Sequence, residues 1–191
     1  RLIHVDSDPT AIGLNRPVDV GIAGDARATL RVLLKAVKER CAPRKEHPGF
    51  EKYHACSQSW RNQLENTLGM SAGGINPGQM VKTVRDYFPR DAITVMDGGN
   101  TSLWTASFNP ILSPRSYLYT AKFGHLGTGL PYAIGAKLAA PERPVYLISG
   151  DGALGFNIQE LETARRYGAN ITVVVSCDQG WGMERSSQLF A

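Results

Sequence analysis

The sequence has few cysteines and lacks any long apolar run. Cys41, Cys56 and Cys177 are odd in number and widely spaced, which indicates neither a disulfide framework nor a zinc site. We therefore expect a reducing, cytoplasmic compartment. No apolar run approaches the length of a membrane-spanning helix, so we expect no membrane partner.

A strong excess of one charge is absent as well. The net charge is +4 over 191 residues, of which 42% are hydrophobic and 20% charged, and this composition excludes disordered and fibrous classes. Basic residues gather between Lys35 and Lys52, but aromatic residues do not alternate with them. We interpret this stretch as a solvated linker and expect no nucleic-acid partner.

The first forty residues have the pattern of two short strands and a helix. Apolar runs cover residues 2–5 and 20–23, and apolar residues recur at helical spacing between residues 26 and 38. This is too small for a domain, and the sequence starts without Met inside the first predicted strand. We expect residues 1–40 to be the C-terminal part of a central α/β domain whose first part lies upstream.

A linker and a second domain are predicted to follow. Residues 41–75 are richer in Pro, Gly and Lys, with one helix expected over residues 57–66. Asn76-Pro77 then predicts a helix start. The rest of the chain alternates predicted helices with three apolar strands, at residues 92–96, 145–149 and 171–176. Continuous apolar strands separated by helices indicate a three-layer αβα fold over residues 76–191, with a parallel sheet buried on both faces.

Each predicted strand of this domain ends in acidic or glycine residues. The three ends read Asp97-Gly98-Gly99-Asn100, Gly150-Asp151-Gly152 and Asp178-Gln179-Gly180. Open parallel sheets bind ligands outside the carboxyl ends of their strands. A right-handed crossover brings Asp151 and Asp178 to the same edge, on strands about 4.8 Å apart. Their oxygen donors suit Mg²⁺ or Ca²⁺, whereas Cys177 is a soft donor and is not expected to be a ligand.

The segment after Asp151 also predicts a helix start. Asn157 is followed three residues later by Glu160, which is the spacing of a capping box. The positive end of such a helix would favour a diphosphate group held by the same cation.

Together these motifs resemble those of thiamine-diphosphate-dependent enzymes. The Gly-Asp-Gly turn at residue 150, with Asn157, Glu160 and Asp178 after it, is similar to the thiamine-diphosphate motif. Residues 95–104 and 127–136 resemble the acetolactate synthase group and its carboligase and lyase relatives. Residues 3–9 and 22–25 resemble the end of that group's central domain.

The resemblance implies a thiamine diphosphate-binding fold and a set of ligand contacts. Asp151 and Asp178 would bind Mg²⁺ together with the backbone carbonyl of Gly180. The positions that match diphosphate contacts are Gly99, Asn100, Thr101, Gly152 and Ala153.

Three further residues are candidates for the catalytic side of the site. Leu126 matches the bulky residue that holds the cofactor in its bent form, and Met183 matches a residue that faces the substrate. His125, beside Leu126 in a glycine-rich loop, is a candidate proton shuttle.

The sequence departs from the family pattern in two ways. Cys177 and Asp178 stand where the family usually has two Asn residues, and the added negative charge beside a diphosphate makes the cation more necessary. The family's catalytic Glu belongs to an N-terminal pyrimidine-binding domain that these residues do not include. We therefore expect a homodimer or homotetramer, in which that domain of a neighbouring subunit completes the site, and no turnover by these residues alone.

The resemblance implies an acetolactate-synthase-like transferase or lyase that acts as a carboligase or decarboxylase on 2-keto acids. A 2-hydroxyacyl-CoA lyase or an oxalyl-CoA decarboxylase stays open, because Trp181-Gly182-Met183 does not separate these specificities. FAD or a CoA nucleotide also stays open as a ligand of the central domain. From another class, a non-catalytic diphosphate-binding module is an alternative. A Rossmann dehydrogenase is not favoured, because no Gly-x-Gly-x-x-Gly follows a strand.

Overall fold

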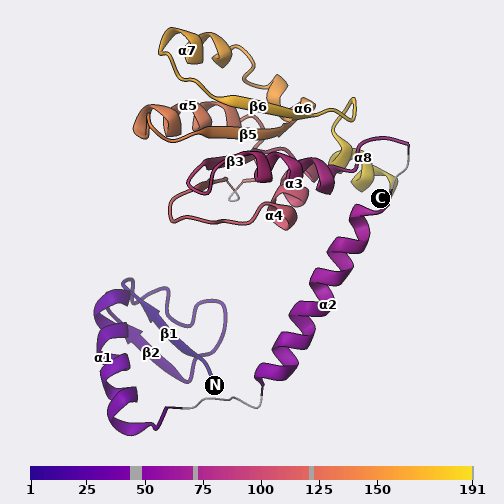
Figure 1. Ribbon diagram of the computed structural model, residues 1–191. Helices are drawn as coiled ribbons and strands as arrows, with labels where there is room; N and C mark the ends of the chain where they lie inside the picture. The colour runs from indigo at the N-terminus through magenta and orange to yellow at the C-terminus, as the bar shows by residue number, and fades with distance from the viewer. Residues whose placement is uncertain (44–48, 71–72, 121–122, 191) are drawn as a thin grey trace. The chain divides into compact units, whose positions relative to one another are not determined.

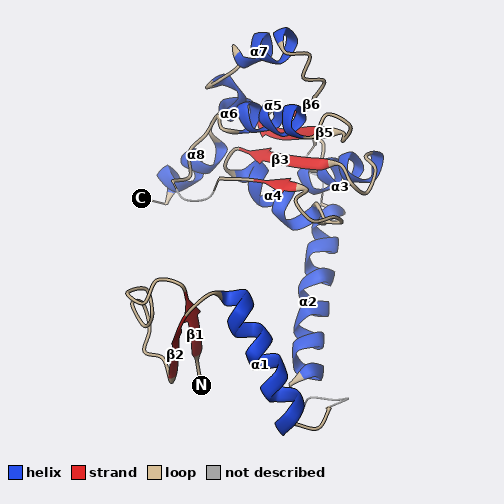
Figure 2. Ribbon diagram, turned by 90° about the vertical axis from the view of Figure 1, so that its left-hand side faces the viewer, coloured by secondary structure: helices blue, strands red, loops and turns tan. Residues whose placement is uncertain are grey.

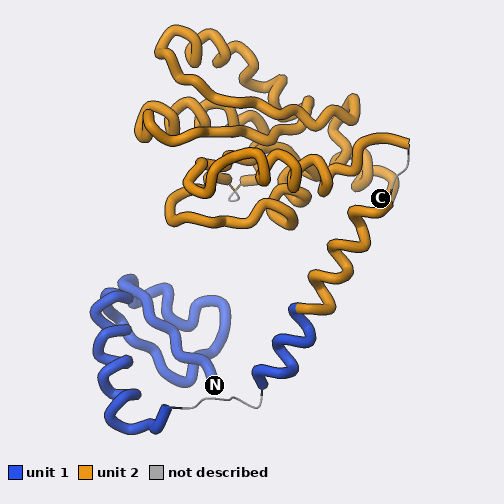
Figure 3. Tube along the Cα trace, in the orientation of Figure 1, with its two compact units in different colours: residues 1–57 blue, residues 58–191 orange. Residues whose placement is uncertain are grey.

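The computed structural model describes residues 1–43, 49–70, 73–120 and 123–190. The chain forms two compact units, residues 1–57 and 58–191, which Figures 1 and 3 show along the chain. Within the described residues, no helix is long and apolar enough to cross a membrane.

The first unit contains a two-stranded parallel sheet and a helix. β1 (Ile3–Asp6) pairs with β2 (Val20–Ala23), and α1 (Ala26–Arg40) follows. The helix begins where the Asp25 carboxylate accepts the N–H of Ala28 at 2.8 Å. The predicted order of strand, loop, strand and helix is confirmed.

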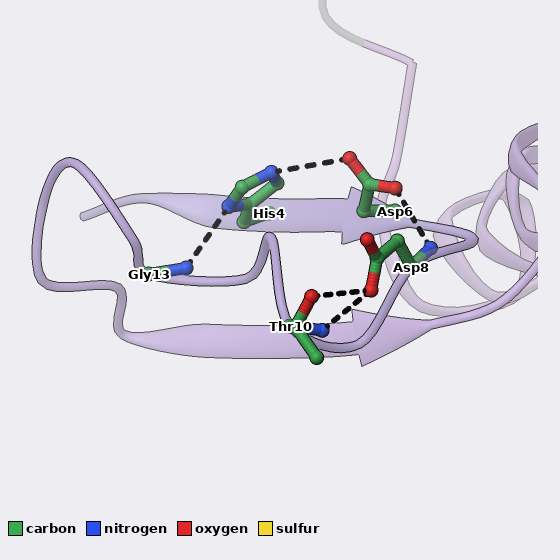
Figure 4. Close-up of polar contacts among 5 residues, drawn as sticks. All are labelled: His4, Asp6, Asp8, Thr10 and Gly13. Carbon is green, nitrogen blue, oxygen red and sulfur yellow. Dashed lines mark hydrogen bonds and ion pairs between the residues drawn. The ribbon is translucent and has the colours of Figure 1, made fainter.

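Polar contacts order the turn that follows β1 (Figure 4). Asp6 Oδ1 accepts the N–H of Asp8 at 2.9 Å, and Asp8 Oδ1 accepts the hydroxyl and the N–H of Thr10 at 2.7 and 2.8 Å. These two hydrogen bonds hold the pKa of Asp8 below its usual value, and the bond from the Thr10 hydroxyl has the larger effect. His4 Nδ1 accepts the N–H of Gly13 at 3.3 Å, while its Nε2 lies 3.8 Å from Asp6 Oδ2. These contacts brace the loop between the two strands.

The helix predicted over residues 57–66 is longer in the structure. α2 (Phe50–Leu68) spans 19 residues, and neither Gly nor Pro interrupts it. Both halves of the helix are mostly exposed.

Asn76 joins the end of α2 to the start of α3 (Pro77–Tyr87). Its Nδ2 donates to the carbonyls of Thr67 and Met70 at 2.7 and 2.8 Å. Its Oδ1 accepts the first free N–H groups of α3 at 2.9 and 3.2 Å. The helix start predicted at Asn76-Pro77 is confirmed, and the same side chain orients the helix before it.

A four-stranded parallel sheet forms the centre of the second unit. Its order is β4-β3-β5-β6, and its strands are β4 (Tyr117–Leu118), β3 (Ile93–Asp97), β5 (Val145–Gly150) and β6 (Thr172–Ser176). α3 and α4 (Asn100–Phe108) lie on one face, and α5 (Gly129–Ala139) and α7 (Glu160–Arg166) lie on the other (Figure 2). The predicted three-layer α/β fold is confirmed.

Alternate residues of the strands build two cores, one on each face. Val145 and Leu147 of β5 pack toward α5, and Tyr146 and Ile148 pack toward α3 and α4. Burying an aliphatic side chain of this size stabilises the fold by about 1.5–3 kcal/mol. β6 is only partly buried, in contrast to the prediction that every strand is buried on both faces, because it pairs with one neighbour within the described residues.

A closed ring of hydrogen bonds lies inside the second core. Thr94 Oγ1 donates to Tyr146 Oη at 2.6 Å, Tyr146 Oη donates to Asn109 Oδ1 at 2.6 Å, and Asn109 Nδ2 donates to Thr94 Oγ1 at 3.2 Å. All three residues are buried. The Tyr146 ring also stacks on Phe88, with centroids 4.3 Å apart. The ring of hydrogen bonds ties β3 and β5 to the end of α4.

Basic side chains bind backbone carbonyls at the amino edge of the sheet. Arg85, which is 4% exposed, donates to the carbonyls of residues 88, 89 and 90, which lead into β3. Arg143 Nε donates to the Asp91 carbonyl at 2.7 Å, and its Nη1 donates to the Arg115 carbonyl at 3.1 Å. These cations satisfy carbonyls that the strands leave unpaired.

Candidate functional site

A pocket opens at the opposite, carboxyl edge of the same sheet. It is lined by the residues that follow β3, β4, β5 and β6, together with the loop before α5. Every predicted site residue lies in its wall: Gly99, Asn100, Thr101, His125, Leu126, Asp151, Gly152, Ala153, Asp178, Gly180 and Met183. The fold therefore brings together residues that are up to 84 positions apart in the sequence, counted from Gly99 to Met183.

Asp151 leaves β5 as the first residue of α6 (Asp151–Gly155). Its Oδ1 accepts the N–H of Gly152 at 2.9 Å, and its Oδ2 accepts the Cys177 thiol at 3.5 Å. Burial raises the pKa of Asp151, but hydrogen bonds from Gly152, Cys177 and the Gln179 backbone outweigh it, so the pKa lies below its usual value. The carboxylate is ionised at neutral pH and available to a cation.

Asp178 reaches the same pocket from the neighbouring strand. β5 and β6 pair in register at Gly150 and Ser176, so both carboxylates emerge at one edge. Gln179, between Asp178 and Gly180, has a φ of 64°, and a non-glycine residue in this left-handed region stores strain of about 1–3 kcal/mol. Such strain is typical of loops that hold a ligand.

Glycines allow α8 (Gly182–Leu189) to approach the other strand ends. A Cβ on Gly182 would overlap the Asp178 carboxylate and lie 3.1 Å from Asn100 Nδ2. A Cβ on Gly99 would lie 2.8 Å from Met183 Cβ. The start of α8 is therefore packed against the start of α4, and Met183 fills the space beside Gly99.

Trp181 lines the side of the pocket next to α6, and Phe156 packs against it. Trp181 lies so near Gly152 that a Cβ there would overlap the indole ring. The indole stacks on Phe156, with ring centroids 5.7 Å apart and an interplanar angle of 24°. These rings shield the first turn of α6 from one side.

Asp97, for which the sequence predicted no individual role, is the buried acid of the site. It is 4% exposed. Its Oδ1 accepts the N–H groups of Gly98 and Gly127 at 2.8 and 3.3 Å, and its Oδ2 accepts that of Gly129 at 2.7 Å. Burial raises the pKa of Asp97, while these N–H groups and His125 oppose the rise. Asp97 thus fixes β3 to the loop that carries His125 and Leu126.

The helix start predicted at Asn157 is wrong. α7 begins at Glu160, with Gln159 as its first flanking residue and no side-chain cap. Asn157 Nδ2 instead donates to the carbonyl of Gly127 at 2.7 Å, so its amide group serves a loop that is distant in sequence. The helix that starts at the pocket is α6, at Asp151.

A fourth strand end, that of β4, also contributes to the pocket and was not predicted from the sequence. Tyr119 and Thr120 line the pocket and follow β4, which has two residues. A strand of two residues gives too short an apolar run to be recognised from the periodicity of its hydrophobic residues.

The donor set fits a hard cation and a diphosphate. In the described ranges, no three His, Cys, Asp or Glu side chains gather as a complete metal cage. Mg²⁺ needs none, because it is commonly bound by one or two carboxylates together with phosphate oxygens and water. Two carboxylates, a backbone carbonyl and the starts of two helices provide such a set.

Comparison with known proteins agrees with this geometry. Residues 97–190 match the family model described as "Thiamine pyrophosphate enzyme, C-terminal TPP binding domain". This part of the chain is similar to the C-terminal domain of thiamine pyrophosphate enzymes. The matched residues begin at Asp97 and include the ends of β3, β5 and β6 and the loop between them. Thiamine pyrophosphate is another name for thiamine diphosphate, so the predicted resemblance is confirmed.

Acetolactate synthase large subunits are similar to nearly the whole chain. The acetolactate synthase large subunit of Parasynechococcus marenigrum is 34% identical over 188 residues, which cover 98% of this chain and 30% of that protein. The large subunit from Haemophilus influenzae is 31% identical, with 98% and 32% covered. The acetolactate synthase isozyme 3 large subunit of Escherichia coli is 30% identical, with 98% and 32% covered. The chain spans about a third of the length of these relatives.

Proposed function

We propose that the natural protein containing this chain is a thiamine diphosphate- and Mg²⁺-dependent carboligase or decarboxylase of 2-keto acids, acetolactate-synthase-like in its reaction. The meeting of Asp151, Asp178 and the Gly180 segment at one pocket, within a thiamine pyrophosphate enzyme domain, carries the proposal. The similarity to acetolactate synthase large subunits favours 2-keto acids over acyl-CoA substrates.

Asp151 and Asp178 would bind the cation through carboxylate oxygens, and Gly180 through its carbonyl. A diphosphate bound to that cation would meet the N–H groups at the starts of α4 and α6, of which that of Gly152 donates to Asp151 Oδ1 in the structure. Gly99, Asn100 and Thr101 belong to the first start, and Gly152 and Ala153 to the second.

The remaining pocket residues would act on the reacting end. Bound thiamine diphosphate supplies a nucleophilic carbon and an electron sink for breaking a bond next to a carbonyl. Leu126 would support the cofactor in its bent form, His125 would hold or release a proton, and Met183 would contact the substrate. The Trp181–Phe156 stack would exclude water from the diphosphate end.

The complete site is proposed to need more than these residues. A Glu on the protein's own N-terminal pyrimidine-binding domain would contact the pyrimidine ring from a neighbouring subunit, in a homodimer or homotetramer. A cytoplasmic location is proposed from the reduced, exposed cysteines, and FAD or a CoA nucleotide remains a candidate ligand of the central domain.

Titration calorimetry on the natural protein tests the proposal. Thiamine diphosphate should bind in Mg²⁺ and should lose measurable binding after EDTA treatment, with recovery when Mg²⁺ is restored. Assays with pyruvate, a 2-hydroxyacyl-CoA and oxalyl-CoA then separate the substrate classes, and consumption of pyruvate is expected. Undiminished binding in EDTA would exclude the cation bridge, and binding without any turnover would favour a non-catalytic module.

A further inference from the structure

Both backbone polar groups of Gly127 are hydrogen-bonded to side chains that are distant in sequence. Its N–H donates to Asp97 Oδ1 at 3.3 Å, and its carbonyl accepts Asn157 Nδ2 at 2.7 Å. Asp97 ends β3, whereas Asn157 follows α6 and therefore depends on β5. The end of β3 and the segment after α6 thus hold one buried residue, Gly127.

The neighbouring residues leave the backbone of Gly127 little freedom to move. Gly127 has a φ of 89°, which L-residues with a Cβ rarely adopt. A Cβ at this position would lie 2.5 Å from Phe156 Cβ and 3.0 Å from Asn157 Nδ2. Two residues further on, the second oxygen of Asp97 accepts the N–H of Gly129 at 2.7 Å. The chain is therefore fixed on both sides of Thr128.

Gly127 directly follows the two pocket residues of this loop. Leu126 is joined to Gly127 by a peptide bond, and His125 precedes it. Both line the pocket, and His125 is exposed. The positions of His125 and Leu126 in the pocket therefore depend on the backbone conformation of Gly127.

We infer that Asp97 and Asn157 are positioning residues that clamp the backbone of Gly127 and so hold Leu126 and His125 against the cofactor. This inference rests on the proposed function. Neither side chain needs to touch the cofactor, because each acts through the backbone of Gly127.

The chemistry of each clamp residue is specific. Asp97 accepts N–H groups with both oxygens, so Asp97→Asn would direct an NH₂ group against one of these donors. Asn157 donates to a carbonyl, so Asn157→Asp would direct a carboxylate oxygen against that carbonyl. Both substitutions preserve shape. The NH₂ group of Asp97→Asn would oppose the N–H groups of Gly98 and Gly127 if it replaced Oδ1, or that of Gly129 if it replaced Oδ2. Asn157→Asp removes the one bond to the Gly127 carbonyl.

The test compares these two variants and Asn157→Ala with a matched control, Tyr146→Phe. The control loses buried hydrogen bonds in the same domain, in the core between the sheet and α3 and α4. On the natural protein we would measure hydrogen exchange of the segment 124–132 without cofactor, calorimetric affinity for thiamine diphosphate in Mg²⁺, and kcat and KM for pyruvate.

Asp97→Asn and Asn157→Asp should accelerate exchange of segment 124–132 and lower kcat by roughly 10- to 100-fold, the scale expected for a misplacement of about 1 Å. The KM for pyruvate should change little. Because both side chains hold the same residue, Gly127, the double variant should lose less than the product of the single losses. Tyr146→Phe should lower the unfolding temperature. The hydrogen exchange of segment 124–132, the affinity for thiamine diphosphate and kcat should stay unchanged.

The clamp is refuted if both exchange of segment 124–132 and kcat in the two variants match the control. If Asp97→Asn does not fold, Asn157→Ala decides alone, since it removes one partly exposed amide group. If the wild-type protein binds no thiamine diphosphate, the proposed function fails. Exchange in the cofactor-free protein still decides whether the clamp exists.

Discussion

Tyr146→Phe should destabilise the domain by about 2–4 kcal/mol, and the buried hydrogen-bond ring gives the reason. The substitution removes the hydroxyl that accepts from Thr94 and donates to Asn109, both at 2.6 Å. Each buried polar group left unpaired costs about 1–3 kcal/mol. Phenylalanine keeps the stacking on Phe88, so the loss is almost entirely polar. Against a typical stability of about 5–15 kcal/mol, this is a large fraction.

Urea unfolding of the natural protein, followed by far-UV circular dichroism, measures this loss as a lower midpoint at unchanged slope. Thr94→Val is the companion variant, because it removes the second hydroxyl and leaves Tyr146 donating to Asn109. The double variant should lose less than the sum of the two single losses, since the partners are removed together. A loss below about 0.5 kcal/mol for Tyr146→Phe, or strict additivity, would show that the three groups do not act as a closed ring.

Three further predictions concern the metal ligands, the amino edge and alkaline pH. Asp151→Ala should abolish Mg²⁺-dependent calorimetric binding of thiamine diphosphate, whereas Asp178→Asn should retain it, because Asn keeps an oxygen donor; equal damage would argue against Asp178 as a ligand. Arg85→Met should lower the free energy of unfolding by about 2–4 kcal/mol, since three carbonyls lose a charged donor; a neutral result in urea would mean that water replaces the guanidinium. Burial raises the pKa of Tyr117 to about 12 from 10.0, so the stabilisation by its neutral phenol is complete below pH 10 and is lost as the pH rises through 12. Tyr117→Phe should remove that loss in alkaline unfolding curves, and an unchanged curve would contradict the assignment.

Sequence patterns predicted the sheet and the members of the site because both depend on regular features. Buried parallel strands give continuous apolar runs, and strand ends that carry Asp or Gly meet at one edge, as Asp151 and Asp178 do. The role of Asn157 was missed because its partner, Gly127, is 30 residues away. A capping pattern depends on local spacing, whereas a tertiary contact of this length has no signature in one sequence. The role of Asp97 was missed for the same reason, although its place at a strand end was recognised.

The two edges of the central sheet differ in what a substitution there would alter. At the amino edge, Arg85, Lys137 and Arg143 are committed to carbonyls, so replacing them changes stability. At the carboxyl edge, Met183 and His125 line the pocket and make no side-chain hydrogen bond within the described residues. Random mutagenesis should therefore yield variants with altered substrate preference mainly from the carboxyl edge, whereas temperature-sensitive variants should arise mainly from the amino edge.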